Sequence, residues 1–190
     1  MTKKIVDLLV KNNAIDESDR AVYEYSVRTA VMFIITVLIG IFIGLHLGCL
    51  LPCIIYIALF IIMRKFTGGY HTKHRWSCIS LSACIIYLCT YCITSCDNLY
   101  TVTVVELVSV MIILILSPQE NVNHPLKQYE KQLFHKVVIG LLCTYILVEL
   151  VCMITGRLIY YNCIAICIIS IATLQLTQLI NIKFHRYRKM

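Results

Sequence analysis

Residues 29–63 read TAVMFIITVLIGIFIGLHLGCLLPCIIYIALFIIM and contain no Lys, Arg, Asp or Glu. As one helix with a rise of about 1.5 Å per residue, this stretch is about 52 Å long, whereas the hydrocarbon core of a bilayer is about 30 Å thick. Gly48 and Pro52 near its middle are typical of a turn. We therefore expect two tightly connected transmembrane helices, over residues 28–46 and 49–63.

Four further apolar stretches continue this pattern toward the C-terminus. They cover residues 76–96, 99–117, 137–155 and 158–182, and their lengths suit helices that cross a bilayer. The composition agrees, because only 14% of the residues are charged, against about 25% in an average soluble domain. The expected fold is an all-α integral membrane protein of about six transmembrane helices, with short outer turns, an interfacial N-terminal helix and two cytoplasmic loops.

The basic residues predict which side of the membrane each connection faces. All Lys and Arg residues except Arg157 fall in the N-terminal segment, in the two longer connections or in the C-terminal tail. Cytoplasmic loops retain positive charge, so these four regions are expected in the cytoplasm. We predict a multi-pass protein of the cell membrane with both termini on the cytoplasmic face. No signal peptide is expected, since residues 1–28 lack a compact apolar core followed by a cleavage site.

The chain is expected to form a single membrane-embedded domain over residues 1–190. Residues 1–27 are interpreted as an interfacial segment, whose apolar side chains face lipid while its lysines meet anionic headgroups. Residues 28–182 would form the transmembrane bundle and residues 183–190 a basic tail. The lipid bilayer is thus an expected partner, and no nucleic acid is expected.

Eleven cysteines are distributed along the chain. All except Cys78 lie in the apolar stretches, where a thiol is most simply a small apolar filler. Cys89, Cys92 and Cys96 share one helix face, but no matching Cys or His cluster completes a zinc or iron–sulfur ligand set there. We therefore expect neither a metal nor a cofactor.

The segment 64–78 reads RKFTGGYHTKHRWSC and concentrates the polar, titratable and turn-forming residues of the chain. Gly68 and Gly69 permit positive φ angles, so the chain can fold back after the second span, and their amides can approach a substrate carbonyl. His71 and Cys78 would lie about 10 Å apart along one unbroken helix, too far for a hydrogen bond. A Cys–His dyad therefore requires the loop that the glycines make possible.

Cys78 is expected in the opening turns of the third span. Helix N-terminal amides and the neighbouring Lys73 and Arg75 favour a thiolate there, which is the form of cysteine that acts as a nucleophile. Two other interpretations stay open at this point. One is a structural cysteine near an interfacial histidine, and the other is a zinc site of His71, His74 and Cys78, which lacks a fourth ligand.

Two motifs resemble the accessory gene regulator B (AgrB) family of peptide-processing membrane proteins. Residues 68–73 (GGYHTK), followed by Cys78, are similar to the family's glycine-rich loop, which bears a His seven residues before its catalytic Cys. Residues 117–126 (SPQENVNHPL) resemble the family's proline-bounded, asparagine-containing cytoplasmic loop. The length and the pattern of spans are also similar over essentially the whole chain.

The resemblance implies a cysteine endopeptidase with His71 as general base and Cys78 as nucleophile. Its implied substrate is a small precursor peptide with an acidic C-terminal tail. Removal of the tail would leave the peptide as a thioester on the enzyme, and a Cys or Ser of the peptide would then close a thiolactone or lactone ring. The implied product is a quorum-sensing autoinducing peptide.

Substrate-binding residues are expected around the two cytoplasmic loops. Basic side chains there would attract an acidic tail, although the same charges also orient the chain in the membrane without any substrate. The candidates for substrate binding are Arg64, Gly68, Gly69, Lys73, Asn123 and Lys127.

The resemblance also implies a homodimer, and a glycine stripe offers one possible seam. Gly40, Gly44 and Gly48 recur at every fourth residue of the first span, which predicts close helix packing either within the chain or between two copies.

A small membrane peptide transporter or exporter without covalent chemistry is the alternative function. Glu106 and Glu149 lie within spans, where an ionisable group is a functional candidate. The sequence contains no internal repeat and no pair of matching broken helices, which are typical of transporters.

Overall fold

The computed structural model describes residues 6, 7, 10, 16, 20–68, 75–119 and 128–187. These residues form helices and turns, without a strand among them. The chain divides into two compact units, Met1–Ile39 and Gly40–Met190. The fold is therefore all-α, as the sequence predicted.

The first unit contains most of helix α2 (Arg20–His46). The helix begins before residue 28, where the first span was expected, and its apolar part, Ala30–His46, is shorter than the other apolar helices. Arg20 at its first turn forms an ion pair with Asp7. Both side chains are solvent-exposed, so the pair contributes at most about 1 kcal/mol.

The second unit contains the remaining five helices of the described chain. They are α3 (Leu50–Thr67), α4 (Arg75–Ser95), α5 (Leu99–Leu116), α6 (Gln128–Ile154) and α7 (Leu158–Tyr187). Each is long and apolar enough to cross a membrane. Three bounds in this unit differ from the prediction by several residues: α3 continues past Met63 to Thr67, α6 already begins at Gln128, and α7 continues past Ile182 to Tyr187, into the predicted basic tail.

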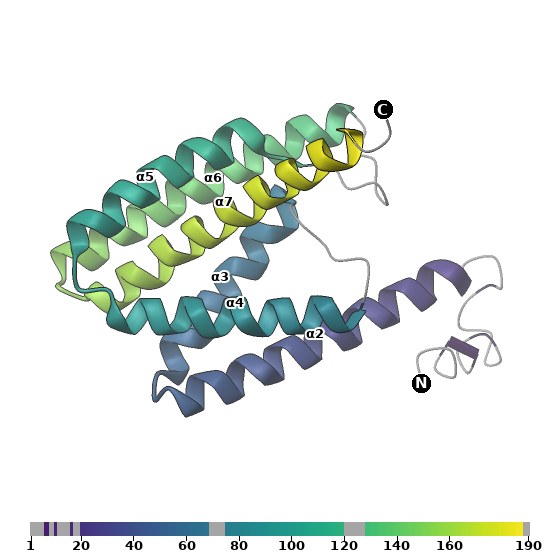
Figure 1. Cartoon of the computed structure of the whole chain (residues 1–190), viewed down its shortest axis with the longest axis horizontal. Coiled ribbons are helices and arrows are strands. Elements are labelled where there is room, and N and C mark those ends of the chain that lie inside the picture. Colours follow the sequence, from purple (N-terminus) through teal and green to yellow (C-terminus); the bar gives the residue numbers. More distant parts are fainter. Residues whose placement is uncertain are drawn as a thin grey trace. The chain divides into compact units, whose positions relative to one another are not determined.

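The connections of the second unit separate into two ends (Figure 1). Residues 47–49, 96–98 and 155–157 form short turns at one end, called the turn end below. The helix ends that flank residues 69–74 and 120–127 lie at the other, called the loop end, together with the last turns of α7. The assignment of the loop end to the cytoplasm remains a prediction.

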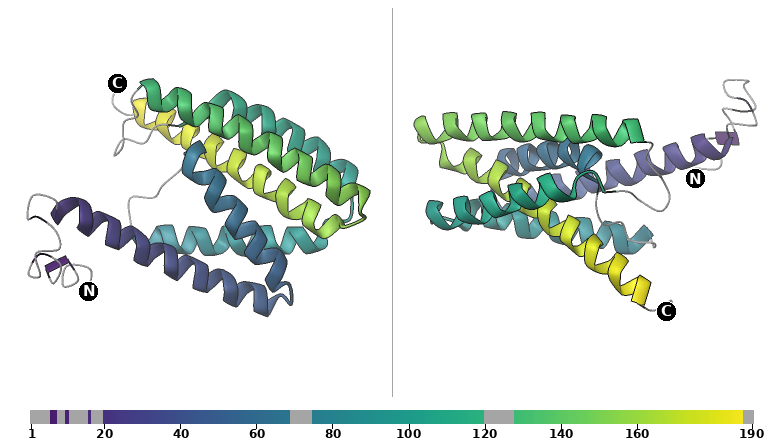
Figure 2. Two further views of the ribbon diagram at one scale, coloured as in Figure 1. Left: turned by 180° about the vertical axis from the view of Figure 1, so that it is seen from behind. Right: turned by 90° about the horizontal axis from the view of Figure 1, so that it is seen from above.

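Helix α7 lies in the middle of the second unit. It contacts α3, α4, α5 and α6, and the views in Figure 2 show it between them. In its apolar window, 61% of the residues are buried, against at most 28% in the other four spans. Because lipid is as apolar as the helix surfaces, packing and hydrogen bonding around α7 hold the unit together, rather than a hydrophobic driving force.

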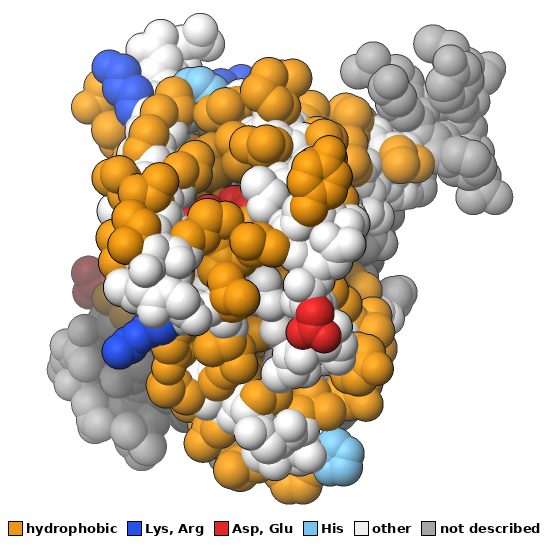
Figure 3. Space-filling view, turned by 90° about the vertical axis from the view of Figure 1, so that its left-hand side faces the viewer, with side chains coloured by type: hydrophobic (Ala, Val, Ile, Leu, Met, Phe, Trp, Pro, Cys, Tyr) orange, Lys and Arg blue, Asp and Glu red, His pale blue; other side chains and the backbone are white. Residues whose placement is uncertain are grey.

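Apolar side chains also cover the outside of the second unit. Figure 3 shows a face dominated by hydrophobic side chains, and Ile115 and Ile154 are 75% and 78% exposed. The hydroxyl groups on such surfaces bond to their own helices, as Thr173 and Thr177 do to the carbonyls four residues earlier. Apolar surface outside and satisfied polar groups are what a bilayer requires, so the chain is a multi-pass membrane protein.

Two glycines of the stripe, Gly40 and Gly44, pack within the chain, whereas a Cβ atom on Gly48 would meet no described atom within 4 Å. A Cβ atom on Gly40 would lie 2.3 Å from the side chain of Ile57, and one on Gly44 would lie 3.0 Å from the Cα of Leu50. The thiol of Cys53 also donates to the carbonyl of Gly40 at 3.3 Å. Helix α3 therefore occupies the face that Gly40 and Gly44 share. The predicted homodimer is not tested by this packing.

Asn162 of α7 ends helix α4 at the turn end. Its side-chain amide donates to the carbonyls of Ile93 and Cys96 at 3.1 and 3.0 Å. Ile93 lies in the last turn of α4, where carbonyls lack a partner within their own helix, and Cys96 is the first residue after the helix. A single buried amide thus joins the end of α4 to the central helix.

Candidate active site at the loop end

The predicted site falls partly within the described residues. Arg64, Gly68 and Cys78 are described. Residues 69–74 and 120–127 are not described, and they contain the other predicted site residues, Gly69, His71, Lys73, Asn123 and Lys127. The Cys–His dyad, the zinc alternative with His74 and these substrate contacts remain predictions.

Gly68 ends helix α3 in a conformation that favours glycine. Its φ is 70° and its ψ is −154°, and its amide donates to the carbonyl of Arg64 at 3.2 Å. A Cβ atom at this position would lie 2.4 Å from the backbone oxygen of Gln119. The positive φ expected for the glycine pair is confirmed at Gly68, where the missing side chain lets residue 119 approach.

Arg64, in the last turn of α3, interacts with the end of its own helix and with a residue of α4. Its guanidinium donates to the carbonyl of Gly68 at 3.1 Å and interacts electrostatically with Cys78. Cys78 is the fourth residue of α4, so it lies in the first turn of the third span as predicted. The Cys78 side chain is partly exposed, whereas Cys53 has no exposed surface. Two predicted site residues from different helices are therefore near enough to interact electrostatically.

A hydrogen-bonded cluster of Thr67, Ser117, Gln119 and Gln175, called the Gln175 node below, joins three segments at this place. The carbonyl of Thr67 accepts from the side-chain amide of Gln175 at 3.1 Å and from the backbone amide of Gln119 at 3.0 Å. The Gln175 amide also donates to the hydroxyl of Ser117 at 2.8 Å. The side-chain amide of Gln119 donates to the backbone carbonyl of Gln175 at 2.9 Å.

The node brings together the starting points of both loops. Thr67 is the last residue of α3, just before the segment with His71, while Ser117 and Gln119 follow α5 and precede the segment with Asn123. Helix α6 joins the same cluster, since His135 Nδ1 lies 3.0 Å from the carbonyl oxygen of Ser117. Both predicted loops therefore begin side by side, anchored to the central helix.

Two buried acceptors in the node have no donor within the described residues. They are the side-chain oxygens of Gln119 and Gln175. A buried polar atom without a hydrogen bond costs about 1–3 kcal/mol, so N–H groups that reach these oxygens would be bound favourably.

The sequence analysis missed Gln175 and Gln119. Gln175 lies in an apolar span and has no exposed surface, and a polar amide at such a position was the available signal. An amide has no charge and does not titrate, so the sequence pattern that indicates catalytic groups does not include it.

Glu106 and Glu149 lie toward the turn end and outside this site. Glu106 accepts from the hydroxyl of Tyr161 at 3.0 Å, and that hydroxyl lies 2.8 Å from the hydroxyl of Thr103. Glu149 of α6 is also buried, and its Oε1 atom has no hydrogen-bond partner among the described residues.

The fold and the described part of the site define a multi-pass helical membrane protein with a partly exposed cysteine in the first turn of one span, while the preceding span ends at a glycine with positive φ. The chain belongs to the accessory gene regulator B (AgrB) family, whose model matches residues 2–179. This confirms the resemblance seen in the sequence and assigns the chain to the processing of peptides in accessory gene regulator quorum sensing. No curated protein and no solved structure matches the chain.

Proposed function

We propose that the chain is a cysteine endopeptidase that removes the acidic C-terminal tail of a small precursor peptide and promotes closure of a thiolactone or lactone ring. The observation that carries this proposal is the position of Cys78 in the first turn of α4, within electrostatic range of Arg64. The Arg64 guanidinium in turn donates to the carbonyl of Gly68, three residues before His71 in the sequence. The family membership supports the same chemistry.

Acylation of the enzyme is the first chemical step. The Cys78 thiolate attacks the scissile carbonyl, and His71, protonated by the thiol, gives that proton to the leaving amine. The C–N bond breaks, a C–S bond forms, and the acidic tail leaves as a peptide with a free amino terminus. The guanidinium of Arg64 is placed to offset negative charge at Cys78 before the attack.

Ring closure is the second step. A Cys or Ser side chain of the bound peptide gives its proton to His71 and attacks the thioester carbonyl. A new C–S or C–O bond closes the ring, and the thiolate of Cys78 leaves. Exchange of one thioester for another conserves the type of bond, so no nucleotide is needed provided that water is kept away from the acyl-enzyme. A site at the membrane boundary helps to exclude water.

Substrate recognition is assigned to charges and acceptors at the loop end. Arg64, Lys73 and Lys127 attract the carboxylates of the tail, and Gly68, Gly69 and Asn123 contact the peptide near the scissile bond. The side-chain oxygens of Gln119 and Gln175 are suited to accept N–H groups from an extended peptide. The partner is thus an acidic peptide that reaches the enzyme from the cytoplasm, where both termini also lie. The enzyme acts as a homodimer in the membrane.

Co-expression with a precursor from a short reading frame beside the gene tests the proposal. Mass spectrometry should detect the cleaved tail with the unaltered chain and none with Cys78→Ala or His71→Ala. The double variant should be no worse than either single one, because the two residues act as a unit. Cys143→Ala is the matched control, since Cys143 is exposed on a membrane span far from the site, and it should process normally.

Substantial cleavage by Cys78→Ala or by His71→Ala would remove that residue from the mechanism. Export of an intact precursor by the Cys78→Ala variant would instead favour the transporter alternative.

A further inference from the structure

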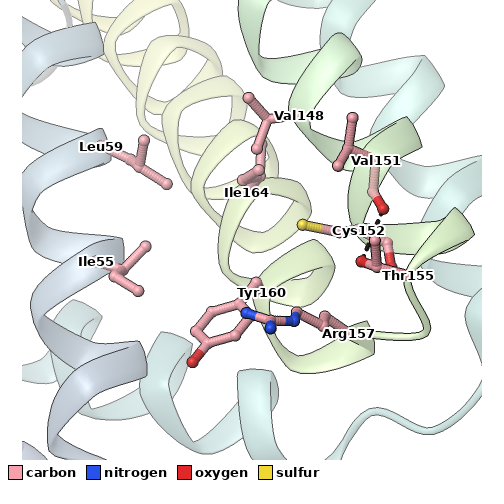
Figure 4. A pocket seen from close by; sticks show the side chains of 9 residues that line it. All are labelled: Ile55, Leu59, Val148, Val151, Cys152, Thr155, Arg157, Tyr160 and Ile164. Carbon is pink, nitrogen blue, oxygen red and sulfur yellow. Dashed lines mark hydrogen bonds between the residues drawn. The ribbon is translucent and has the colours of Figure 1, made fainter.

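A cavity of about 570 Å³ lies between α3, α6 and α7 near the turn end. In Figure 4, Ile55 and Leu59 of α3 form one side, Val148 and Val151 of α6 form the other, and Ile164 of α7 lies between them. All these side chains are aliphatic and belong to helices that cross the membrane. The interior of the cavity therefore suits a hydrocarbon chain.

A positive charge lies at one edge of this cavity. Arg157, in the turn before α7, is exposed, and it lines the cavity together with Tyr160 (Figure 4). The amides of the first turn of α7 are also at this edge, and the positive end of a helix dipole favours an anion. Arg157 is the only Lys or Arg between Lys136 and Lys183, so the charge is isolated in an apolar region.

We propose that this cavity binds one anionic phospholipid. Its acyl chain lies among the aliphatic side chains, and its phosphate contacts the guanidinium of Arg157 and the hydroxyl of Tyr160. The molecule that fits must be apolar along its length and anionic at the level of Arg157, which are the two properties of such a lipid. A guanidinium attracts a phosphate group on either side of the membrane, because both are charged and Arg can donate two parallel hydrogen bonds to the phosphate oxygens.

The shape of the cavity favours a single chain over a protein partner. Helices α3, α6 and α7 contact one another pairwise, so they enclose the cavity on three sides. A volume of about 570 Å³ is that of a small-molecule site, whereas a docking helix is about 10–12 Å wide and needs an open groove. A second copy of the chain is therefore an unsuitable occupant.

Photolabelling of the unaltered chain tests the proposal without any substitution. The full chain is reconstituted in phosphatidylcholine vesicles that contain a trace of phosphatidylglycerol with a diazirine on its acyl chain. After photolysis, peptide mapping should locate the label on residues 55–59 and 148–164. Unlabelled phosphatidylglycerol should displace the probe about fivefold better than added phosphatidylcholine, the preference that one interfacial cation supplies. Equal displacement by both lipids, or label spread evenly over all helices, would overturn the proposal.

Two matched pairs of variants then test the two ends of the site. Ile55→Trp fills the cavity and should abolish labelling there, while Ile54→Trp, whose side chain is 43% exposed and does not line the cavity, should leave labelling unchanged. Arg157→Gln should remove the preference for phosphatidylglycerol, and Arg157→Lys should retain it. Labelling of the cavity in Ile55→Trp would contradict the assignment, and so would a preference for phosphatidylglycerol in Arg157→Gln. A crosslink between two copies of the chain through this cavity would also contradict it.

Discussion

Replacing Gln175 by leucine removes the hydrogen bonds that hold the start of the predicted catalytic loop. Gln175 has no exposed surface, and its side-chain amide donates to Thr67 and to Ser117. Leucine is similar in size, so the change deletes two bonds while leaving little or no cavity. The carbonyl of Thr67 keeps its bond from the Gln119 amide, and therefore the loop is loosened rather than released.

The expected effect on activity is larger than the expected effect on stability. Two buried hydrogen bonds contribute about 1 kcal/mol each, so the loss of stability should be about 2–3 kcal/mol. A displacement of about 1 Å in a catalytic group can slow a reaction about a hundredfold. If the node positions the loop, Gln175→Leu should therefore lower the rate of acyl-enzyme formation about tenfold to a hundredfold.

Asn162→Leu provides the control for a merely structural effect. Asn162 lies on the same helix, is also buried, and also donates two bonds to the end of a neighbouring helix, but at the turn end. Thermal unfolding in detergent should show similar losses of stability for both variants. Single-turnover cleavage of the precursor should be slow only for Gln175→Leu. Equal rates for the two variants would refute the positioning role, even if Cys78→Ala confirms the nucleophile.

Three further predictions concern the loop end and the topology. Gly68→Ala should abolish processing while helical circular dichroism persists. A non-glycine residue at φ 70° and ψ −154° is strained by about 1–3 kcal/mol, and its Cβ atom would meet the backbone of Gln119; normal processing would contradict this geometry. A polar maleimide applied briefly to membranes should label the partly exposed Cys78 before the fully buried Cys53, and peptide mapping would detect the opposite order. Accessibility tags at residues 1, 122 and 190 should report the cytoplasm and a tag near Asp97 the outside, whereas an outside signal at residue 122 would require a different number of spans.

The helices could be predicted from the sequence because an uncharged stretch of about 20 residues has few structural solutions. The prediction for residues 99–117 differs from α5, Leu99–Leu116, by a single residue. The larger errors, at the end of α3, the start of α6 and the end of α7, share one cause. An uncharged stretch marks only the apolar part of a helix, whereas the helix itself can continue through polar residues such as Arg64, Gln128 and Lys183.

The site could be predicted only where local chemistry determines it. A Gly-Gly pair after a span predicts a positive φ angle, and Gly68 has a φ of 70°. A cysteine that follows a basic segment predicts the start of a helix, and Cys78 lies in the first turn of α4. The Gln175 node depends instead on residues that are far apart in the sequence. Its bonds form only because α7 is rotated so that Gln175 faces Thr67, and no pattern within α7 specifies that rotation.

The polar groups of α7 explain how a chain with so few charges obtains a defined arrangement. In a bilayer, apolar faces are interchangeable with lipid, so directional bonds between helices fix their register. Tyr161 binds Glu106 of α5 and Asn162 binds the end of α4 at the turn end, while Gln175 binds the end of α3 at the loop end. Each bond joins the central helix to a different neighbour. The register of α3 against α7 also determines the position of residue 68, where the predicted catalytic loop begins. The placement of that loop therefore depends on the buried, uncharged amide of Gln175, which follows the loop in the sequence by more than a hundred residues.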